Sequence, residues 1–382
     1  MKLFDVYPLF DIEPVKAQGC WIWDKEGKNY LDFYGGHAVI SIGHSHPHYV
    51  QLLKEQLEKI AFYSNSVKIK QQEELAQKLG ELSGYNDYAL FLCNSGAEAN
   101  ENALKLASFH NGRKKVIAFE KSFHGRTSLA VAATNDASIQ APVNSEHDIV
   151  FLPLNDEQAF LQAINKDVCA VIIEGIQGVA GIQTPSSEFL KLIRLKCTET
   201  GTIMILDEVQ SGYGRSGKFF AHQHANIQPD IITIAKGMGN GFPVAGVIIH
   251  PNIKPKHGLL GTTFGGNYLA CAAAIAVLDV IKNEQLIANS QQVGDYIIEK
   301  LKTIEGVKEV RGKGLMIGVE LHFNSAQVRN DLVFKHNIFT GSASNKNTIR
   351  LLPPLNITKA EADHFLQGFT LALKPHLQSI TQ

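Results

Sequence analysis

A lysine stands where an apolar stretch ends and a strand is expected to finish. Lys236 follows Ile231–Ala235 and precedes Gly237, Gly239 and Gly241, so it lies in a turn of little steric bulk. Burial and a neighbouring cation lower the pKa of a lysine amine, and a neutral amine condenses readily with an aldehyde. The alternative is a solvated lysine at the end of its strand, as most lysines are. Lys236 is therefore a candidate attachment point for a carbonyl compound.

A carboxylate occupies the corresponding position after another apolar stretch. Asp207 follows Thr202–Leu206 and precedes Glu208, Val209 and Gln210. A protonated pyridine nitrogen would give this carboxylate the cationic partner that it needs. Such an ion pair keeps a pyridine ring an effective electron sink for a carbanion at the substrate carbon. The alternative is a carboxylate bonded to neighbouring backbone N–H groups or to an arginine.

Two glycine-containing turns offer groups that suit a phosphate. Asn94–Asn100 follows the apolar stretch Ala89–Cys93 and places Ser95 and Gly96 at the opening of a helix. Backbone N–H groups are free at such a turn and attract anions. An ordinary N-capping serine with a nearby acid is the alternative. Gly261–Asn267 supplies hydroxyls before another helix and is a second candidate phosphate contact.

An aromatic ring, an imidazole and a guanidinium lie together in Phe123–Arg126, a few residues after Val116–Phe119. An aromatic ring can stack on a pyridine, and an arginine can bind a carboxylate through two hydrogen bonds. The alternatives are a core phenylalanine and a surface ion pair.

Positioning these side chains requires a sheet that brings the ends of several strands together. Between Asn86 and His250, short apolar runs alternate with turns and longer amphipathic stretches, as is typical of parallel β-α units. Ligands bind beyond the carboxyl ends of parallel strands, so the polar residues after each strand are expected to meet. The predicted strands are Ala89–Cys93, Val116–Phe119, Val168–Ile173, Thr202–Leu206, Ile231–Ala235 and Val244–Ile249, covered by helices such as Glu98–Phe109 and Glu188–Thr200.

The composition narrows the class of protein. With 382 residues, 45% of them apolar, the chain is expected to bury more than one typical core. Its 36 Lys and Arg residues balance 37 Asp and Glu residues, so no global field favours nucleic acid. The five cysteines include no Cys-x-x-Cys pair, and no metal site is predicted. Residues 1–18 contain no apolar signal or membrane anchor, so the cytoplasm is the expected compartment.

A chain of motifs resembles the class III (ornithine-like) aminotransferases of fold type I, most of all the acetylornithine aminotransferases. The resemblance extends from about Tyr7 to Ala372 and is highly specific for the family. The matching segments are Gly19–Phe33, Gly43–Pro47, Asn94–Ala107, Ser122–Thr127, Leu206–Ala221, Pro229–Val247, Gly261–Cys271, Val310–Leu321 and Ile349–Leu355.

The resemblance implies pyridoxal 5'-phosphate as coenzyme and a homodimer with shared active sites. Arg126 and Arg350 are implied as two carboxylate-binding arginines, which suits a dicarboxylic co-substrate such as 2-oxoglutarate. The implied coenzyme contacts are Ser95, Gly96 and Ala97 at the phosphate, Thr263 at the phosphate from the partner subunit, Phe123 stacked on the ring, Asp207 at the ring nitrogen, Gln210 near the ring hydroxyl, and Lys236 as the Schiff-base and proton-transfer residue.

The resemblance also implies an α/β fold in three parts. Residues 1–48 are expected to pack with the small domain, residues 49–267 to form the large coenzyme-binding domain around a mainly parallel sheet, and residues 268–382 to form a connecting helix and a small α+β domain. The helix is predicted in the apolar stretch Tyr268–Ile281, and the small domain around Val307–Leu321 and Ile349–Leu351.

The implied reaction transfers the δ-amino group of an N2-acylated ornithine, acetyl or succinyl, to 2-oxoglutarate. The products are the acylated glutamate semialdehyde and glutamate, and the expected role is arginine biosynthesis. Ornithine or 4-aminobutyrate transamination, aminomutation and decarboxylation are alternatives on the same fold. A non-catalytic or nucleotide-binding protein is the alternative from another class, but no Gly-x-Gly-x-x-Gly or Walker lysine follows the first strand.

One position departs from the family pattern. The family usually has a glutamate where this chain has Val179, and the resemblance implies that in relatives this glutamate masks the arginine matching Arg350. Valine cannot ionise. The sequence therefore leaves two outcomes open: Arg350 is exposed, or another group such as His37, itself a departure, covers it.

Overall fold

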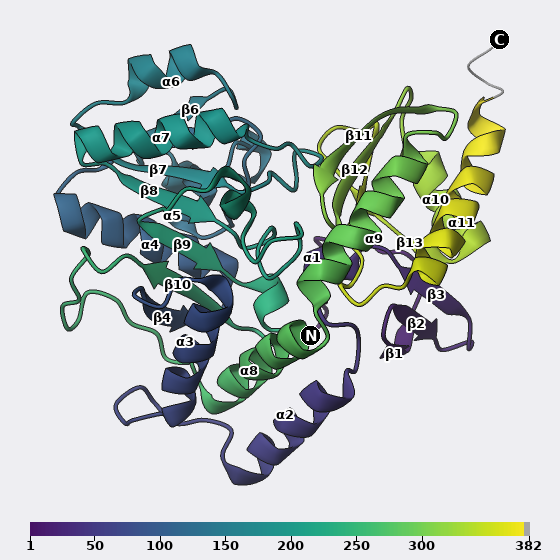
Figure 1. Ribbon diagram of the computed structural model, residues 1–382, viewed down its shortest axis with the longest axis horizontal. Helices are drawn as coiled ribbons and strands as arrows, with labels where there is room; N and C mark the ends of the chain where they lie inside the picture. Colours follow the sequence, from purple (N-terminus) through teal and green to yellow (C-terminus); the bar gives the residue numbers. More distant parts are fainter. Residues whose placement is uncertain (378–382) are drawn as a thin grey trace.

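The computed structural model describes residues 1–377 and contains one large sheet and two small ones. The large sheet has seven strands in the order β4-β10-β9-β8-β7-β5-β6 and occupies one lobe of the molecule (Figure 1). Its strands are β4 (Ala89–Cys93), β5 (Lys115–Phe119), β6 (Ile149–Leu152), β7 (Val168–Glu174), β8 (Ile203–Asp207), β9 (Ile231–Ile234) and β10 (Ala245–Ile249).

Strand direction in this sheet is parallel from β6 to β9 but reverses at β10. β10 is antiparallel to both β9 and β4, so the interpretation of Val244–Ile249 as part of a parallel unit is wrong in direction. The connection from β9 to β10 holds only a short 3-10 turn, Lys236–Met238, and is too short for a crossover helix. The strand β6 was not predicted, because Ile149–Leu152 is a short and only half-buried edge strand.

Both faces of the large sheet are covered by helices. Met204 and Leu206 of β8 pack into one apolar cluster, while Ile203 and Ile205 pack into another. This alternation follows from the two-residue period of a strand and explains why the strands are apolar throughout. The covering helices are α4 (Gly96–Asn111) and α5 (Ser128–Ala132) on one face, and α6 (Glu157–Ala163), α7 (Ser187–Thr200), α3 (Lys70–Ser83) and α8 (Tyr268–Asn283) on the other.

The helix α8 leads from the large lobe to the smaller one (Figure 1). It is buried along most of its length, and the Asn267 side chain caps it by accepting from the Ala270 N–H. The small lobe holds an antiparallel sheet in the order β11-β12-β15-β14. Its elements are α9 (Leu286–Leu301), β11 (Val307–Lys313), β12 (Met316–Leu321), α10 (Ala326–His336), β13 (Ile338–Phe339), β14 (Gly341–Ser342), β15 (Thr348–Leu351) and α11 (Lys359–Leu377).

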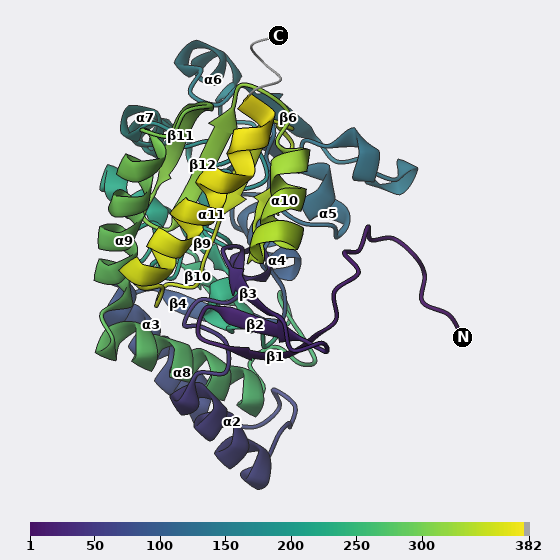
Figure 2. The ribbon, with the colours of Figure 1, turned by 90° about the vertical axis from the view of Figure 1, so that its right-hand side faces the viewer.

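The N-terminal segment joins the small lobe through a third sheet. Its strands β1 (Pro14–Gln18), β2 (Trp21–Asp24) and β3 (Asn29–Asp32) are completed by β13, which pairs with β3 in parallel. The short helix α1 (Gly35–Ala38) follows, and α2 (Pro47–Lys59) returns to pack on α8 (Figure 2). We propose the division at 48/49 and 267/268 for the domains; residues 378–382 of the last range lie outside the described part of the chain.

Within residues 1–377, no helix is both long enough and apolar enough to cross a membrane.

Candidate active site

A cavity of about 400 Å³ lies where the parallel strands end. Segments that follow β4, β5, β7, β8 and β9 all contribute to its lining, as expected for a ligand site in an α/β sheet. Two predicted site residues, Thr263 and Arg350, are not part of the lining. The predicted residues that do line the cavity are Ser95, Gly96, Ala97, Phe123, Arg126, Asp207, Gln210 and Lys236.

Lys236 follows β9 directly and faces the cavity with part of its surface. Its backbone has φ 45°, a left-handed conformation that costs a lysine of order 1 kcal/mol and that is found most often at functional sites. Burial lowers the pKa of the amine, and the nearby Arg350 lowers it further, although Asp207 and Glu174 act in the opposite direction. A larger fraction of this amine is therefore neutral and nucleophilic than in an exposed lysine at the same pH.

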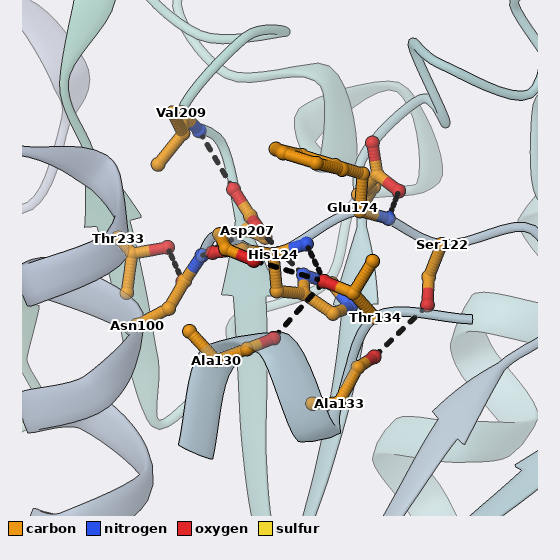
Figure 3. Close-up of polar contacts among 12 residues, drawn as sticks. Asn100, Ser122, His124, Ala130, Ala133, Thr134, Glu174, Asp207, Val209 and Thr233 are labelled. Atoms are coloured by element: carbon orange, nitrogen blue, oxygen red, sulfur yellow. Dashed lines mark hydrogen bonds and ion pairs between the residues drawn. The ribbon is translucent and has the colours of Figure 1, made fainter. Parts of the chain in front are cut away.

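Asp207 ends β8 and is 4% exposed, at the centre of a hydrogen-bond network (Figure 3). Its Oδ2 accepts from Asn100 Nδ2 and contacts His124 Nδ1, both at 2.7 Å, and its Oδ1 accepts from the Val209 N–H at 3.0 Å. A carboxylate has about four acceptor positions, so one remains free for a donor in the cavity. Asp207 therefore does accept a backbone N–H, as one of the sequence alternatives expected. No arginine bonds to it among the described residues.

The turn before α4 both caps the N-terminus of that helix and lines the cavity. Ser95 is the N-cap, and its Oγ accepts from the Glu98 N–H at 3.2 Å, so the capping alternative is correct. The first turn of any helix leaves N–H groups without intrahelical acceptors, and Gly96 and Ala97 of that turn line the cavity. A Cβ on Gly96 would lie 2.6 Å from a Val209 methyl group, so a larger residue there would force Val209 or the turn to move.

Three further lining residues, Arg126, Phe123 and Gln210, differ in exposure and in their hydrogen bonds. Arg126 is exposed and forms no salt bridge within residues 1–377, so the surface ion-pair alternative does not hold in the structure. Phe123 is half-buried, which leaves ring surface open to the cavity. The Gln210 amide donates to the His37 carbonyl at 3.1 Å, and its buried Oε1 has no partner in the described chain.

Thr263 is exposed and outside the cavity. Its neighbour Thr262 instead contacts the turn before α4: Asn94 Nδ2 donates to Thr262 Oγ1 at 3.3 Å. A role for Thr263 in this site therefore requires a second subunit.

Arg350 lies in β15 and is only 5% exposed, so the first outcome left open by the sequence, an exposed arginine, is wrong. Its Nη2 donates to the Tyr34 hydroxyl at 3.1 Å, and that hydroxyl contacts His37 Nδ1 at 2.5 Å. The guanidinium also lies over the Tyr34 ring, 5.7 Å from its centre. No carboxylate forms a salt bridge with it among the described residues, and its buried Nη1 has no partner there. His37 thus contacts Tyr34, the residue whose hydroxyl accepts from Arg350.

Sequence reasoning missed three residues of the site. Asn100 lies on the apolar face of α4, where a polar side chain among Ala99, Ala103 and Ala107 was the available signal. His124 was noted only as part of its segment. Glu174 also lines the cavity, and its signal was the one used for Asp207, an acid at the end of an apolar strand.

The cavity fits pyridoxal phosphate in its donor set. It offers a lysine amine, a buried carboxylate with a free acceptor position, helix N–H groups and an aromatic ring. The buried His124 Nε2 and Gln210 Oε1 have no partner within the described residues, and a bound polar ring is able to supply them. No group of three or more His, Cys, Asp or Glu residues able to hold a metal occurs in residues 1–377.

The architecture and the cavity define a fold type I transferase. The family model for aminotransferase class-III matches residues 5–373. Acetylornithine aminotransferase from Archaeoglobus fulgidus is 41% identical over 91% of this chain and 92% of its own, and the Bacillus subtilis enzyme of that name is 40% identical over 98% of each chain.

Solved structures agree with this assignment. The crystal structure of acetylornithine aminotransferase from Elizabethkingia anophelis has a TM-score of 0.84 and 32% identity, covering 97% of this chain and 95% of that one. Ornithine aminotransferase from Toxoplasma gondii has a TM-score of 0.91 and 27% identity, with 97% and 92% covered. The chain belongs to the class-III aminotransferase family, a family of pyridoxal-phosphate enzymes.

Proposed function

We propose that this aminotransferase moves the δ-amino group of an N2-acylated ornithine to 2-oxoglutarate, in the cytoplasm and in arginine biosynthesis. The observation that carries the proposal is the identity of about 40% to acetylornithine aminotransferases over nearly the whole chain. Ornithine and 4-aminobutyrate are the competing amine substrates.

The lining of the cavity favours an acylated amine over free ornithine. Val39, Ile176 and Val179 supply apolar surface, and the only acids in the lining are Glu174 and Asp207. A free α-ammonium would be desolvated against this apolar surface, which is costly for a charge. An N-acyl group removes that charge and gains from apolar contact.

Pyridoxal phosphate, when bound, supplies an aldehyde for amines and an electron sink for the carbanion. We propose that Lys236 would hold it covalently and that the freed Lys236 amine would accept and return a proton at the substrate carbon. Asp207 would hold the ring nitrogen in its protonated form, and Asn100 and His124 hold Asp207 in place. Arg126 and Arg350 bind substrate carboxylates, Arg350 after its Tyr34 contact is exchanged for the substrate. Ser95, Gly96 and Ala97 bind the phosphate, Phe123 stacks on the ring and Gln210 lies near its hydroxyl.

Substrate choice is tested by transfer from a panel of amines to 2-oxoglutarate. We expect kcat/KM for N-acetyl- or N-succinylornithine to exceed that for ornithine and 4-aminobutyrate by at least about tenfold, because an unpaired buried ammonium is disfavoured. The matched variant Val179→Glu places a carboxylate in the cavity and should narrow the preference against ornithine. Failure of both acylornithines, with glutamate formed from another amine, would remove the acylornithine assignment.

Subunit sharing is tested with Thr263, which lies outside its own chain's cavity. If Thr263 reaches the phosphate of the partner's coenzyme in a homodimer, Thr263→Asp should weaken coenzyme binding at least about tenfold through like-charge repulsion. At a coenzyme concentration well below the dissociation constant of the Thr263→Asp site, Lys236→Ala and Thr263→Asp chains are then each nearly inactive. In a randomly mixed dimer population they restore about one quarter of wild-type sites, because each hybrid has one intact site. Mixtures without any recovery would contradict a shared site, and activity of the Thr263→Asp protein alone would contradict the role of Thr263.

A further inference from the structure

Glu174 is a buried acid of the cavity to which the proposed reaction gives no role. It is the last residue of β7, is 6% exposed, and lies beside Asp207 in the register of β7 and β8. A carboxylate is costly to bury, so its partners indicate what it does.

Each oxygen of Glu174 accepts one backbone N–H, and the two donors belong to different segments of the chain. Oε1 accepts from the Phe123 N–H and Oε2 from the Gly178 N–H, both at 3.0 Å (Figure 3 shows the first). The first peptide carries the aromatic ring of the cavity, and the second precedes Val179. Glu174 forms no salt bridge with any residue in 1–377. The carboxylate therefore connects the segment of Phe123 to the segment of Gly178 through two hydrogen bonds, without an ion pair among the described residues.

Charged and titratable groups surround Glu174 from several elements. His124 and Asp207 flank it, Lys236 faces it from the end of β9, and Arg350 faces it from β15. Burial raises the pKa of Glu174 to about 7, with Asp207 adding to the rise and His124 and the two backbone N–H groups opposing it. Glu174 thus takes up its proton in the neutral range.

We propose that Glu174 is a positioning residue whose ionised carboxylate fixes two peptides, that of the cavity residue Phe123 and that of Gly178, next to the cavity residue Val179, and whose protonation releases one of them. An ionised carboxyl group accepts through both oxygens, whereas a neutral one has an O–H donor on one of them and accepts less strongly. Coenzyme affinity should therefore fall as the pH falls through about 7. This inference rests on the coenzyme site of the proposed function and is independent of the amine substrate.

The test compares Glu174→Gln with Glu101→Gln. A glutamine keeps the size of the side chain, but it has one accepting oxygen and does not titrate. Glu101 is the matched control, because its carboxylate also accepts backbone N–H groups, those of Leu129 and Ala130, outside the cavity. The first readout is the dissociation constant of added pyridoxal phosphate between pH 6 and pH 8, followed by its absorbance.

We expect the wild type and Glu101→Gln to bind the coenzyme about tenfold more weakly at pH 6 than at pH 8, beyond any change seen in Glu174→Gln. At pH 8, Glu174→Gln should bind about tenfold more weakly than the wild type. Equal pH dependence in wild type and Glu174→Gln would overturn the proposal, and so would an equal effect of Glu101→Gln.

A second readout needs neither coenzyme nor substrate. A carboxyl group whose folded pKa lies above its unfolded value stabilises the fold fully at low pH and loses that contribution as the pH rises through the folded pKa. The Tm of the coenzyme-free wild type should therefore fall relative to that of Glu174→Gln between about pH 5 and pH 8, and a constant difference would contradict titration of Glu174 in this range. Loss of acylornithine activity with both readouts as expected would remove the proposed substrate and leave this inference intact.

Discussion

Replacing Lys236 by alanine should lower kcat at least about 10⁴-fold, while pyridoxal phosphate should remain bound through the rest of the cavity. The amine has a pKa lowered by burial and faces the cavity. Lys236 is the only lysine among the lining residues, so no other amine there is able to serve as both nucleophile and proton carrier. Steady-state transfer from an acylornithine to 2-oxoglutarate measures the loss. Borohydride reduction followed by peptide mass spectrometry should find the coenzyme on Lys236 in the wild type and on no lysine in the variant.

Lys121→Ala is the control for this substitution. Lys121 is also a lysine with a left-handed backbone, φ 62°, but it is exposed and outside the cavity. Its replacement should leave kcat within about twofold, since surface substitutions have small effects. Turnover of Lys236→Ala at a rate near that of the wild type, or a coenzyme label on a different lysine, would refute the assignment of Lys236.

Replacing Asp207 by asparagine should lower kcat by about 10²- to 10³-fold, the usual range for one preorganised electrostatic contact. The amide cannot hold a pyridine nitrogen in its cationic form. Its single NH2 group also replaces one accepting oxygen and faces either the Val209 N–H or the pair Asn100 and His124, which already act as donors or contacts at this carboxylate. We therefore expect a loss of folding stability of about 1–3 kcal/mol in addition to the kinetic effect. Kinetics and urea unfolding measure the two parts separately.

Asp230→Asn separates stability from catalysis. Asp230 is a carboxylate with similar duties, accepting from Arg194 Nη1 at 2.7 Å and from the Met204 N–H at 2.8 Å, but it lies outside the cavity. Its replacement should reduce stability and leave kcat nearly unchanged. If both variants lost stability and neither lost kcat, the proposed charge pairing at Asp207 would be disproved.

The strand ends of the large sheet could be predicted because their chemistry is local. Asp207 and Lys236 each follow a run of apolar residues directly, and the parallel arrangement of β8 and β9 brings those ends together. Glu174 has the same local signal, because it directly follows the predicted strand Val168–Ile173 as Asp207 follows Thr202–Leu206, but it was not counted among the site residues.

Long-range contacts could not be predicted from local patterns. The burial of Arg350 depends on Tyr34, which comes from a distant segment of the chain, and no periodicity connects the two. The direction of β10 was also outside the reach of the pattern, because an apolar strand has the same composition in either direction. The direction was set instead by the short connection from β9, which contains no helix.

The reversed strand β10 has a consequence for the synthesis of the chain. β4 is the first strand of the large sheet to leave the ribosome, yet its partner in that sheet is β10, the last of them. Until β10 emerges, the nascent chain carries an apolar strand with open edges, a form prone to aggregation and bound by chaperones. Chains that stall before Ala245 are therefore expected to be the species most dependent on cellular quality control.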